Sequence, residues 1–166
     1  MSKKVAVIMG SDSDFGVMKS AVTTLNQLGI PNEVHIISAH RTPAAAEQFA
    51  RGARDAGFGC IIAAAGKAAH LGGVLAAYTT LPVIGVPMKT SMMGGLDSLL
   101  SIVQMPKGVP VATVAVDGAD NAALLAAQIL GVEDAALAAR LSTQKENMQH
   151  EVEEKDRNIQ KEVSAL

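Results

Sequence analysis

A histidine and an arginine stand side by side in the segment Ser38-Ala39-His40-Arg41-Thr42-Pro43. The segment ends an apolar run and leads into a predicted helix, for which Thr42 is a candidate N-cap and Pro43 suits the first turn. An imidazole can give and take a proton near neutral pH, and a guanidinium offers five fixed donors to a phosphate or carboxylate. The pair therefore indicates a site in which one side chain binds an anion and its neighbour moves a proton.

Three further segments could contribute to such a site. Met9 to Phe15 joins Gly10 to serines and aspartates, which could hold a phosphate or ribose with free helix amides, or could merely cap a helix. Ala64 to Gly73 has small residues that leave room for a ligand or for close helix packing, and Lys67 and His70 are its ionisable groups. Met88 to Gly108 holds adjacent glycines and flexible methionines, which suit a mobile cover or a subunit contact.

Composition excludes several function classes. The 166-residue chain carries a net charge of -2 and is only 2% aromatic, so it lacks both the basic surface and the stacking rings expected of a nucleic-acid-binding protein. No charge-free apolar stretch reaches the ~20 residues that span a bilayer, and the N-terminal segment has no signal-peptide pattern. We expect a soluble cytoplasmic protein. Cys60, the sole cysteine, is predicted to be a buried structural thiol.

Short apolar runs alternate with segments of helical period, which predicts a three-layer α/β/α doubly wound parallel sheet of the flavodoxin-like kind. The expected buried strands are Val5 to Met9, Glu33 to Ile37, Cys60 to Ala64, Pro82 to Val86 and Pro110 to Val116. The expected helices are Ser13 to Leu28, Pro43 to Ala56, Ala69 to Thr79, Leu96 to Gln104 and Ala119 to Leu130. In such sheets ligands bind outside the carboxyl ends of the strands, where the four segments described above would lie.

Taken together, the loops resemble the class I 5-(carboxyamino)imidazole ribonucleotide mutases of purine biosynthesis, the PurE family. The resemblance rests on ordered motifs over nearly the whole chain: MGSDSD from Met9, SAHRTP from Ser38, AGKAAHL from Ala65, GLDSLLSIVQMP from Gly95, GVPVATVAV from Gly108 and NAALLAAQIL from Asn121. It implies an enzyme that moves a carboxylate from the exocyclic nitrogen of an imidazole ribonucleotide to a ring carbon, without ATP, metal or organic cofactor.

The resemblance also implies residue roles. His40 would carry the proton, and Asp14 would contact ribose hydroxyls. The 5'-phosphate would bind Ser11, Ser13, Ser38 and Arg41. The CO2 pocket would be walled by Ala65, Gly66 and Ala68, with Lys67, His70 and Leu71 in the same substrate-binding segment.

Two departures from the usual class I motif AGGAAHLPG stand out, Lys67 and Gly72. Lys67 could attract the anionic substrate or point outward, as lysines usually do. The related class II enzymes carboxylate the aminoimidazole with free CO2, typically carry lysine at the position of Arg41 and lack the counterpart of His70. The presence of Arg41 and His70 thus favours the mutase over the carboxylase. A non-catalytic module that binds a small phosphorylated ligand would share the sheet and the phosphate loop, and stays open.

The tail from Glu133 to Leu166 reads as a helix with an apolar side and many charges. We therefore expect a catalytic α/β domain over residues 1–132 and a helical extension over residues 133–166 that packs on neighbouring subunits. The resemblance implies a homo-oligomer, an octamer, because members of the family assemble that way through their C-terminal helices.

Overall fold

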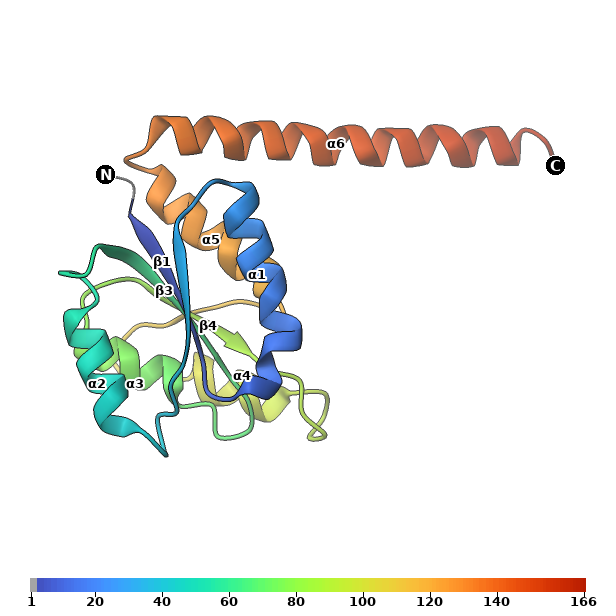
Figure 1. Cartoon of the computed structure of the whole chain (residues 1–166). Helices are drawn as coiled ribbons and strands as arrows, with labels where there is room; N and C mark the ends of the chain where they lie inside the picture. Colours follow the sequence, from blue (N-terminus) through green and yellow to red (C-terminus); the bar gives the residue numbers. More distant parts are fainter. Residues whose placement is uncertain (1–2) are drawn as a thin grey trace.

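Five parallel strands form one sheet in the order β2-β1-β3-β4-β5, with helices on both faces (Figure 1). The computed structural model describes residues 3–166, so the first two residues of the N-terminal segment lie outside the described part. The strands are β1 (Lys4–Met9), β2 (Asn32–Ile36), β3 (Phe58–Ala65), β4 (Val83–Pro87) and β5 (Ala112–Thr113). The order is that of flavodoxin-like sheets, which confirms the predicted fold class.

The connecting helices begin and end close to the predicted boundaries, except that the helix predicted from Pro43 to Ala56 already ends at Gly52. They are a 3-10 turn η1 (Asp12–Asp14), α1 (Phe15–Gln27), α2 (Pro43–Gly52), α3 (Leu71–Tyr78), α4 (Leu96–Val103), α5 (Ala119–Gly131) and α6 (Ala135–Val163). The helix expected from Ala69 begins at Leu71, because two tight turns precede it: the N–H groups of Ala69 and His70 donate to the carbonyls of Lys67 and Ala68.

Alternating side chains of the central strands build two cores. Val5, Val7 and Met9 of β1 pack with Cys60 and Ile62 of β3 against α1 and α5. Ala6 and Ile8 of β1 face the opposite side, where α2, α3 and α4 cover the sheet. This double coverage explains why the central strands are apolar without alternation. Burial raises the pKa of the Cys60 thiol to about 12, in keeping with its predicted structural role.

The prediction of five buried strands is wrong for both edges. In β2, Val34 is 38% and Ile36 58% exposed, because β1 is its sole strand neighbour and the covering helices lie over the centre of the sheet. The run expected from Pro110 to Val116 forms strand over Ala112–Thr113 alone, pairing with Ile84 and Gly85. The chain then leaves the sheet at Asp117, whose φ is 57°.

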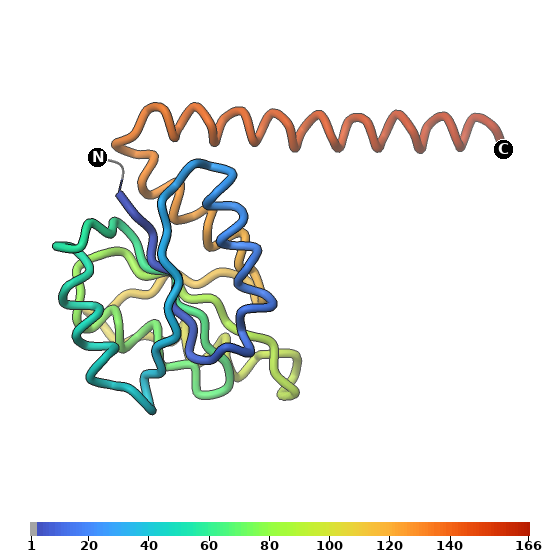
Figure 2. The backbone as a smooth tube through the Cα atoms, in the orientation of Figure 1, coloured from blue at the N-terminus to red at the C-terminus, as the bar shows by residue number. Residues whose placement is uncertain are grey.

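The tail helix projects beyond the α/β unit (Figures 1 and 2). Asp134 caps α6 by accepting the N–H of Leu137 at 2.9 Å, and Leu137 is buried against the core. Arg140 Nε donates to the carbonyl of Leu28 at 2.9 Å. Beyond these turns the apolar side chains of α6 are exposed, among them Met148, Val152, Ile159 and Val163. Within residues 3–166, no helix has the length and apolar character needed to cross a membrane.

Candidate active site

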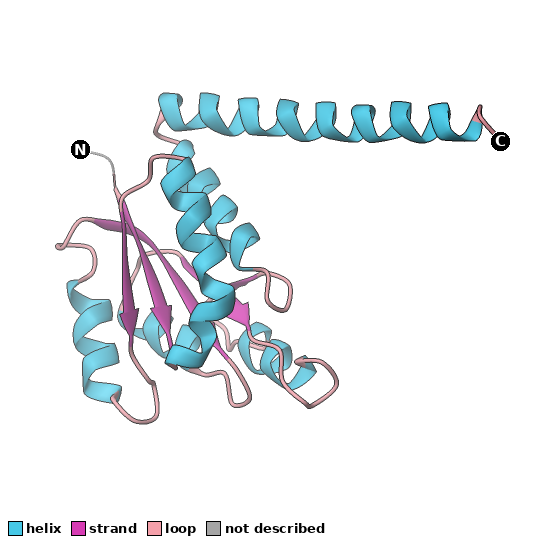
Figure 3. Cartoon of the chain, turned by 45° about the vertical axis from the view of Figure 1, so that its right-hand side comes forward, coloured by secondary structure: helices cyan, strands magenta, loops and turns pink. Residues whose placement is uncertain are grey.

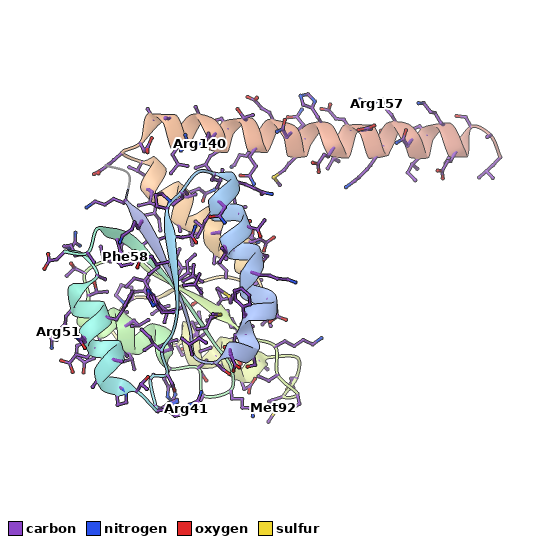
Figure 4. All side chains as sticks on the ribbon, viewed as in Figure 1. Arg41, Arg51, Phe58, Met92, Arg140 and Arg157 are labelled. Atoms are coloured by element: carbon purple, nitrogen blue, oxygen red, sulfur yellow. The ribbon has the colours of Figure 1, made fainter. Side chains whose placement is uncertain are left out.

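The loops that follow β1, β2, β3 and β4 meet at the end of the sheet toward which the strands point, away from α6 (Figure 3). Arg41 and Met92 mark this end in Figure 4. The loops enclose a cavity of about 560 Å³. It is lined by Gly10, Ser11, Ser13, Asp14, Ser38, Ala39, His40, Arg41, Ala65, Gly66, Lys67, Ala68, Leu71, Met88, Lys89 and Thr90. Of the twelve residues predicted for the site, His70 is the one outside this lining.

The loop after β2 is held in shape by its own hydrogen bonds. The hydroxyl of Thr42 donates to the carbonyl of Ser38 and accepts the N–H of Ser38, both at 3.0 Å. Thr42 occupies the N-cap position of α2, but its side chain closes this loop and does not cap the helix. Arg41 Nη2 donates to the carbonyl of Gly10 at 3.0 Å, and the backbone N–H of Arg41 donates to Ser38 Oγ at 3.1 Å. The guanidinium is thereby fixed between the β1 and β2 loops, with further donors free for an anion.

The loop after β1 adds hydroxyls and a carboxyl group. Ser13 Oγ donates to Ser11 Oγ at 2.9 Å, and Ser11 also caps η1 by accepting the N–H of Ser13. The capping and the binding interpretations of these serines are thus compatible, because both hydroxyls also line the cavity. Burial raises the pKa of the Asp14 carboxyl, with the nearby charges of Asp12 and Asp117 acting in the same direction. A half-buried carboxyl at this position suits hydroxyl donors better than another anion.

His40 is bound to His70 across the site. Its Nε2 lies 2.9 Å from Nδ1 of His70, and the two rings meet edge to face at 75° with centroids 5.1 Å apart. His40 comes from the β2 loop and His70 from the turn before α3, so the contact joins residues 30 positions apart. It brings the ionisable groups of two predicted loops together.

The loop after β3 contains a strained residue. Lys67 has φ 57°, in the left-handed region that favours glycine. Its N–H donates to the fully buried Ser98 Oγ at 2.9 Å, and its carbonyl accepts the Ser101 hydroxyl at 3.3 Å. Both serines belong to α4, which therefore fixes this turn. The Lys67 side chain is exposed at the rim of the cavity.

Five lining residues lie within segments that the sequence singled out but are not among the twelve predicted site residues, namely Gly10, Ala39, Met88, Lys89 and Thr90. The last three follow β4, and the signal that could have found them is the rule that ligands bind at strand carboxyl ends. The backbone N–H of Lys89 donates to Asp117 Oδ1 at 2.8 Å, and Thr90 Oγ1 donates to Asp97 Oδ1 at 2.6 Å. The Thr90 hydrogen bond lowers the pKa of the Asp97 carboxyl. These bonds hold the β4 loop against the site.

A larger cavity of about 820 Å³ lies at the other end of the sheet, between the N-terminal strand ends and the start of α6. Its wall includes Phe58, Leu81, Leu137 and Arg140, and none of the predicted site residues. Its wall carries the cations Lys3, Arg54 and Arg140 and the carboxylates of Glu133 and Asp134, but no histidine, so it does not offer the imidazole beside a guanidinium that marks the first cavity. Among residues 3–166, no cluster of three or more His, Cys, Asp and Glu side chains could bind a metal ion.

The sequence and the structure were compared with those of known proteins. The sequence model of the AIR carboxylase family matches residues 4–151. The chain is 54% identical to the N5-carboxyaminoimidazole ribonucleotide mutase of Pyrococcus horikoshii, over 94% of this chain and 88% of that protein. It is also 54% identical to the mutase of the same name from Thermotoga maritima, over 95% and 92%. A crystal structure of Treponema denticola PurE2-S38D matches with a TM-score of 0.86 and 26% identity, over 95% of this chain and 98% of that one. The chain therefore belongs to the AIR carboxylase family.

Proposed function

We propose that the chain is an N5-carboxyaminoimidazole ribonucleotide mutase, which moves the carboxylate of its substrate from the exocyclic N5 to ring carbon C4 in de novo purine biosynthesis. The observation that most supports this proposal is that His40, which can move a proton, and the fixed guanidinium of Arg41 line the same cavity. The names of the relatives that are 54% identical over most of the chain support this reaction.

In this proposal the β1 and β2 loops bind the ribonucleotide. Arg41 and the hydroxyls of Ser11, Ser13 and Ser38 donate to the 5'-phosphate, since charge-assisted bonds from a guanidinium suit phosphate oxygens. Asp14 accepts hydrogen bonds from ribose hydroxyls. The location of all five residues in the cavity wall supports the assignment.

His40 carries the proton in a route that needs no cofactor. The N5–carboxylate bond breaks as His40 gives a proton to N5, which leaves CO2 and the neutral aminoimidazole. Carbon C4 then attacks the retained CO2, and the same imidazole removes the C4 proton. One C–N bond is exchanged for one C–C bond, and His40 ends as it began, so neither ATP nor a redox partner is required.

The released CO2 must stay in the site for the second step to follow. We propose that Ala65, Gly66 and Ala68 wall the space that holds it, with Leu71 also in the cavity lining. A methyl group added at Gly66 would lie 3.3 Å from Met88 Cβ, so little free space is left on that side. Lys67 stands at the rim, where its cation can attract the anionic substrate.

We further propose that residues 1–132 form the catalytic unit and that residues 133–166 pack on neighbouring subunits of a homo-octamer in the cytoplasm. The exposed apolar side chains of α6 and of β2 support association, because a monomer would leave them in water. Light scattering tests this: a mass near eight chains agrees with the proposal, and a stable monomer contradicts it.

The experiment that tests the reaction compares two substrates without ATP. The purified chain receives either N5-carboxyaminoimidazole ribonucleotide or aminoimidazole ribonucleotide with bicarbonate, and formation of the C4 carboxylate is followed. We expect turnover of the first at low CO2. Preference for the second would assign the chain to the carboxylases that use free CO2, and binding without turnover of either would make it a ligand-binding module.

A further inference from the structure

The hydrogen bond between His40 and His70 restricts where the protons of the two rings can be. A bond between two imidazole nitrogens needs a proton on one and a lone pair on the other. Since Nε2 of His40 lies 2.9 Å from Nδ1 of His70, one of these two nitrogens must donate and the other accept. The contact therefore couples the tautomers of the two residues.

His70 contacts His40 without being part of the cavity lining, and both residues are exposed. His40 lines the cavity and His70 does not. The backbone of His70 is fixed, because its N–H donates to the carbonyl of Ala68 and its carbonyl accepts the N–H of Val74, both at 2.9 Å. Its side chain does not cap α3, so the ring is free to serve His40.

The direction of the bond follows from the proton transfer that His40 performs. With Nε2 bound to His70, the nitrogen of His40 left for the substrate is Nδ1. If His70 donated, His40 would already carry its proton on Nδ1 and could not remove one from C4 with that nitrogen. If His70 accepts, Nδ1 of His40 can alternate between lone pair and proton while Nε2 stays bound.

We infer that His70 is a positioning residue that accepts the Nε2 proton of His40, holds its ring against the cavity wall and leaves Nδ1 as the nitrogen that exchanges the substrate proton. The inference rests on the proposed function, because it concerns the proton step. When Nδ1 of His40 takes the C4 proton, the resulting imidazolium donates a charge-assisted hydrogen bond to neutral His70. The pair gives one proton to N5 and regains one from C4, so its proton count is the same at the end of the cycle as at the start.

Two substitutions separate this role from a packing role. In His70→Asn, the side-chain oxygen can take the place of Nδ1 and still accept a hydrogen bond, whereas in His70→Leu a carbon of similar position cannot. We expect His70→Leu to lower kcat roughly 100-fold with KM within about threefold, as loss of an orienting group does in other acid–base sites. His70→Asn should recover most of that loss. Unchanged kcat in His70→Leu, or equal losses in both variants, would overturn the inference.

A second readout does not depend on turnover. Magic-angle-spinning ¹⁵N spectra of ring-labelled histidine, taken near pH 9 where imidazoles are neutral, report which nitrogen carries the proton. We expect His40, assigned by the signals missing in His40→Asn, to be protonated at Nε2 in the wild type and to lose this preference in His70→Leu. His40 protonated at Nδ1 would refute the inference. If the tautomer is as expected but neither substrate turns over, the proposed reaction fails and the hydrogen bond stands.

Discussion

Ser98 is the buried side chain on which the geometry of the β3 loop depends, and Ser98→Ala tests this. Its side chain is 0% exposed, and its Oγ accepts the N–H of Lys67 at 2.9 Å. A left-handed conformation costs a non-glycine residue about 1–2 kcal/mol, so the loop needs such an anchor. The substitution removes the acceptor and leaves a donor without a partner, which costs about 1–3 kcal/mol. We expect a loss of about 2 kcal/mol in the free energy of unfolding.

Differential scanning calorimetry measures the effect. For a chain of this size about 1 kcal/mol corresponds to a Tm change of roughly 2–4 °C, so the Tm of Ser98→Ala should fall by roughly 4–8 °C. Wild type and variant must be compared at one protein concentration, because association makes Tm depend on concentration.

Ser101→Ala is the matched control on the same helix. Ser101 Oγ donates to the carbonyl of Asp97 at 2.7 Å and to that of Lys67 at 3.3 Å, and the residue is half-buried. Loss of these bonds leaves carbonyls that water can reach, so we expect a change within about 0.5 kcal/mol. If Ser98→Ala is no more destabilising than Ser101→Ala, the anchoring role of Ser98 is refuted.

The remaining predictions concern the core and the cavity. Burial raises the pKa of the Asp14 carboxyl, so its ionised form destabilises the fold once the pH rises above the ordinary aspartate range near ~4. In urea unfolding, Asp14→Asn should therefore stabilise the protein at pH 7 and much less at pH 4. Equal effects at both pH values would contradict this. Gly85→Ala should destabilise by about 1–3 kcal/mol in the same assay, because its Cβ would lie 2.4 Å from Ile102 Cγ2, and an unchanged midpoint would count against the packing. The Cys60 thiol, with its pKa raised to about 12, should react with thiol reagents at pH 8 no faster than the chain unfolds; rapid labelling of the folded protein would show that it is accessible.

The central strands could be predicted from sequence because strands that are buried on both faces consist almost wholly of apolar residues. Val5 to Met9 and Cys60 to Ala64 are apolar on both faces, and a strand covered on both faces needs such residues. The exposure of β2 could not be predicted, since Val34 and Ile36 look like core residues whichever strand lies at the edge. Exposure there depends on the order of the strands, which no local pattern records.

The residues of the site could largely be predicted from the sequence, but the hydrogen bonds between them could not. The rule on strand carboxyl ends brings the loops of His40 and His70 to one edge of the sheet. Their hydrogen bond depends on two turns 30 residues apart, so their spacing in the sequence does not indicate it. A lysine by itself does not predict the left-handed backbone of Lys67, but the glycine of the usual class I motif at this position does indicate it. Lys89, in the loop after β4, lines the cavity, whereas the sequence suggested a mobile cover or a subunit contact for this loop.

The account turns on His40 as the group that moves the proton, and His40→Asn tests it most directly. Its kcat with N5-carboxyaminoimidazole ribonucleotide and its Kd for the same nucleotide, measured by calorimetry, should be compared with those of the wild type. We predict that kcat falls by at least roughly 100-fold while Kd stays within about tenfold, because an acid–base group contributes to the transition state more than to binding. A variant that keeps most of its activity, or one whose loss lies wholly in Kd, would contradict the account.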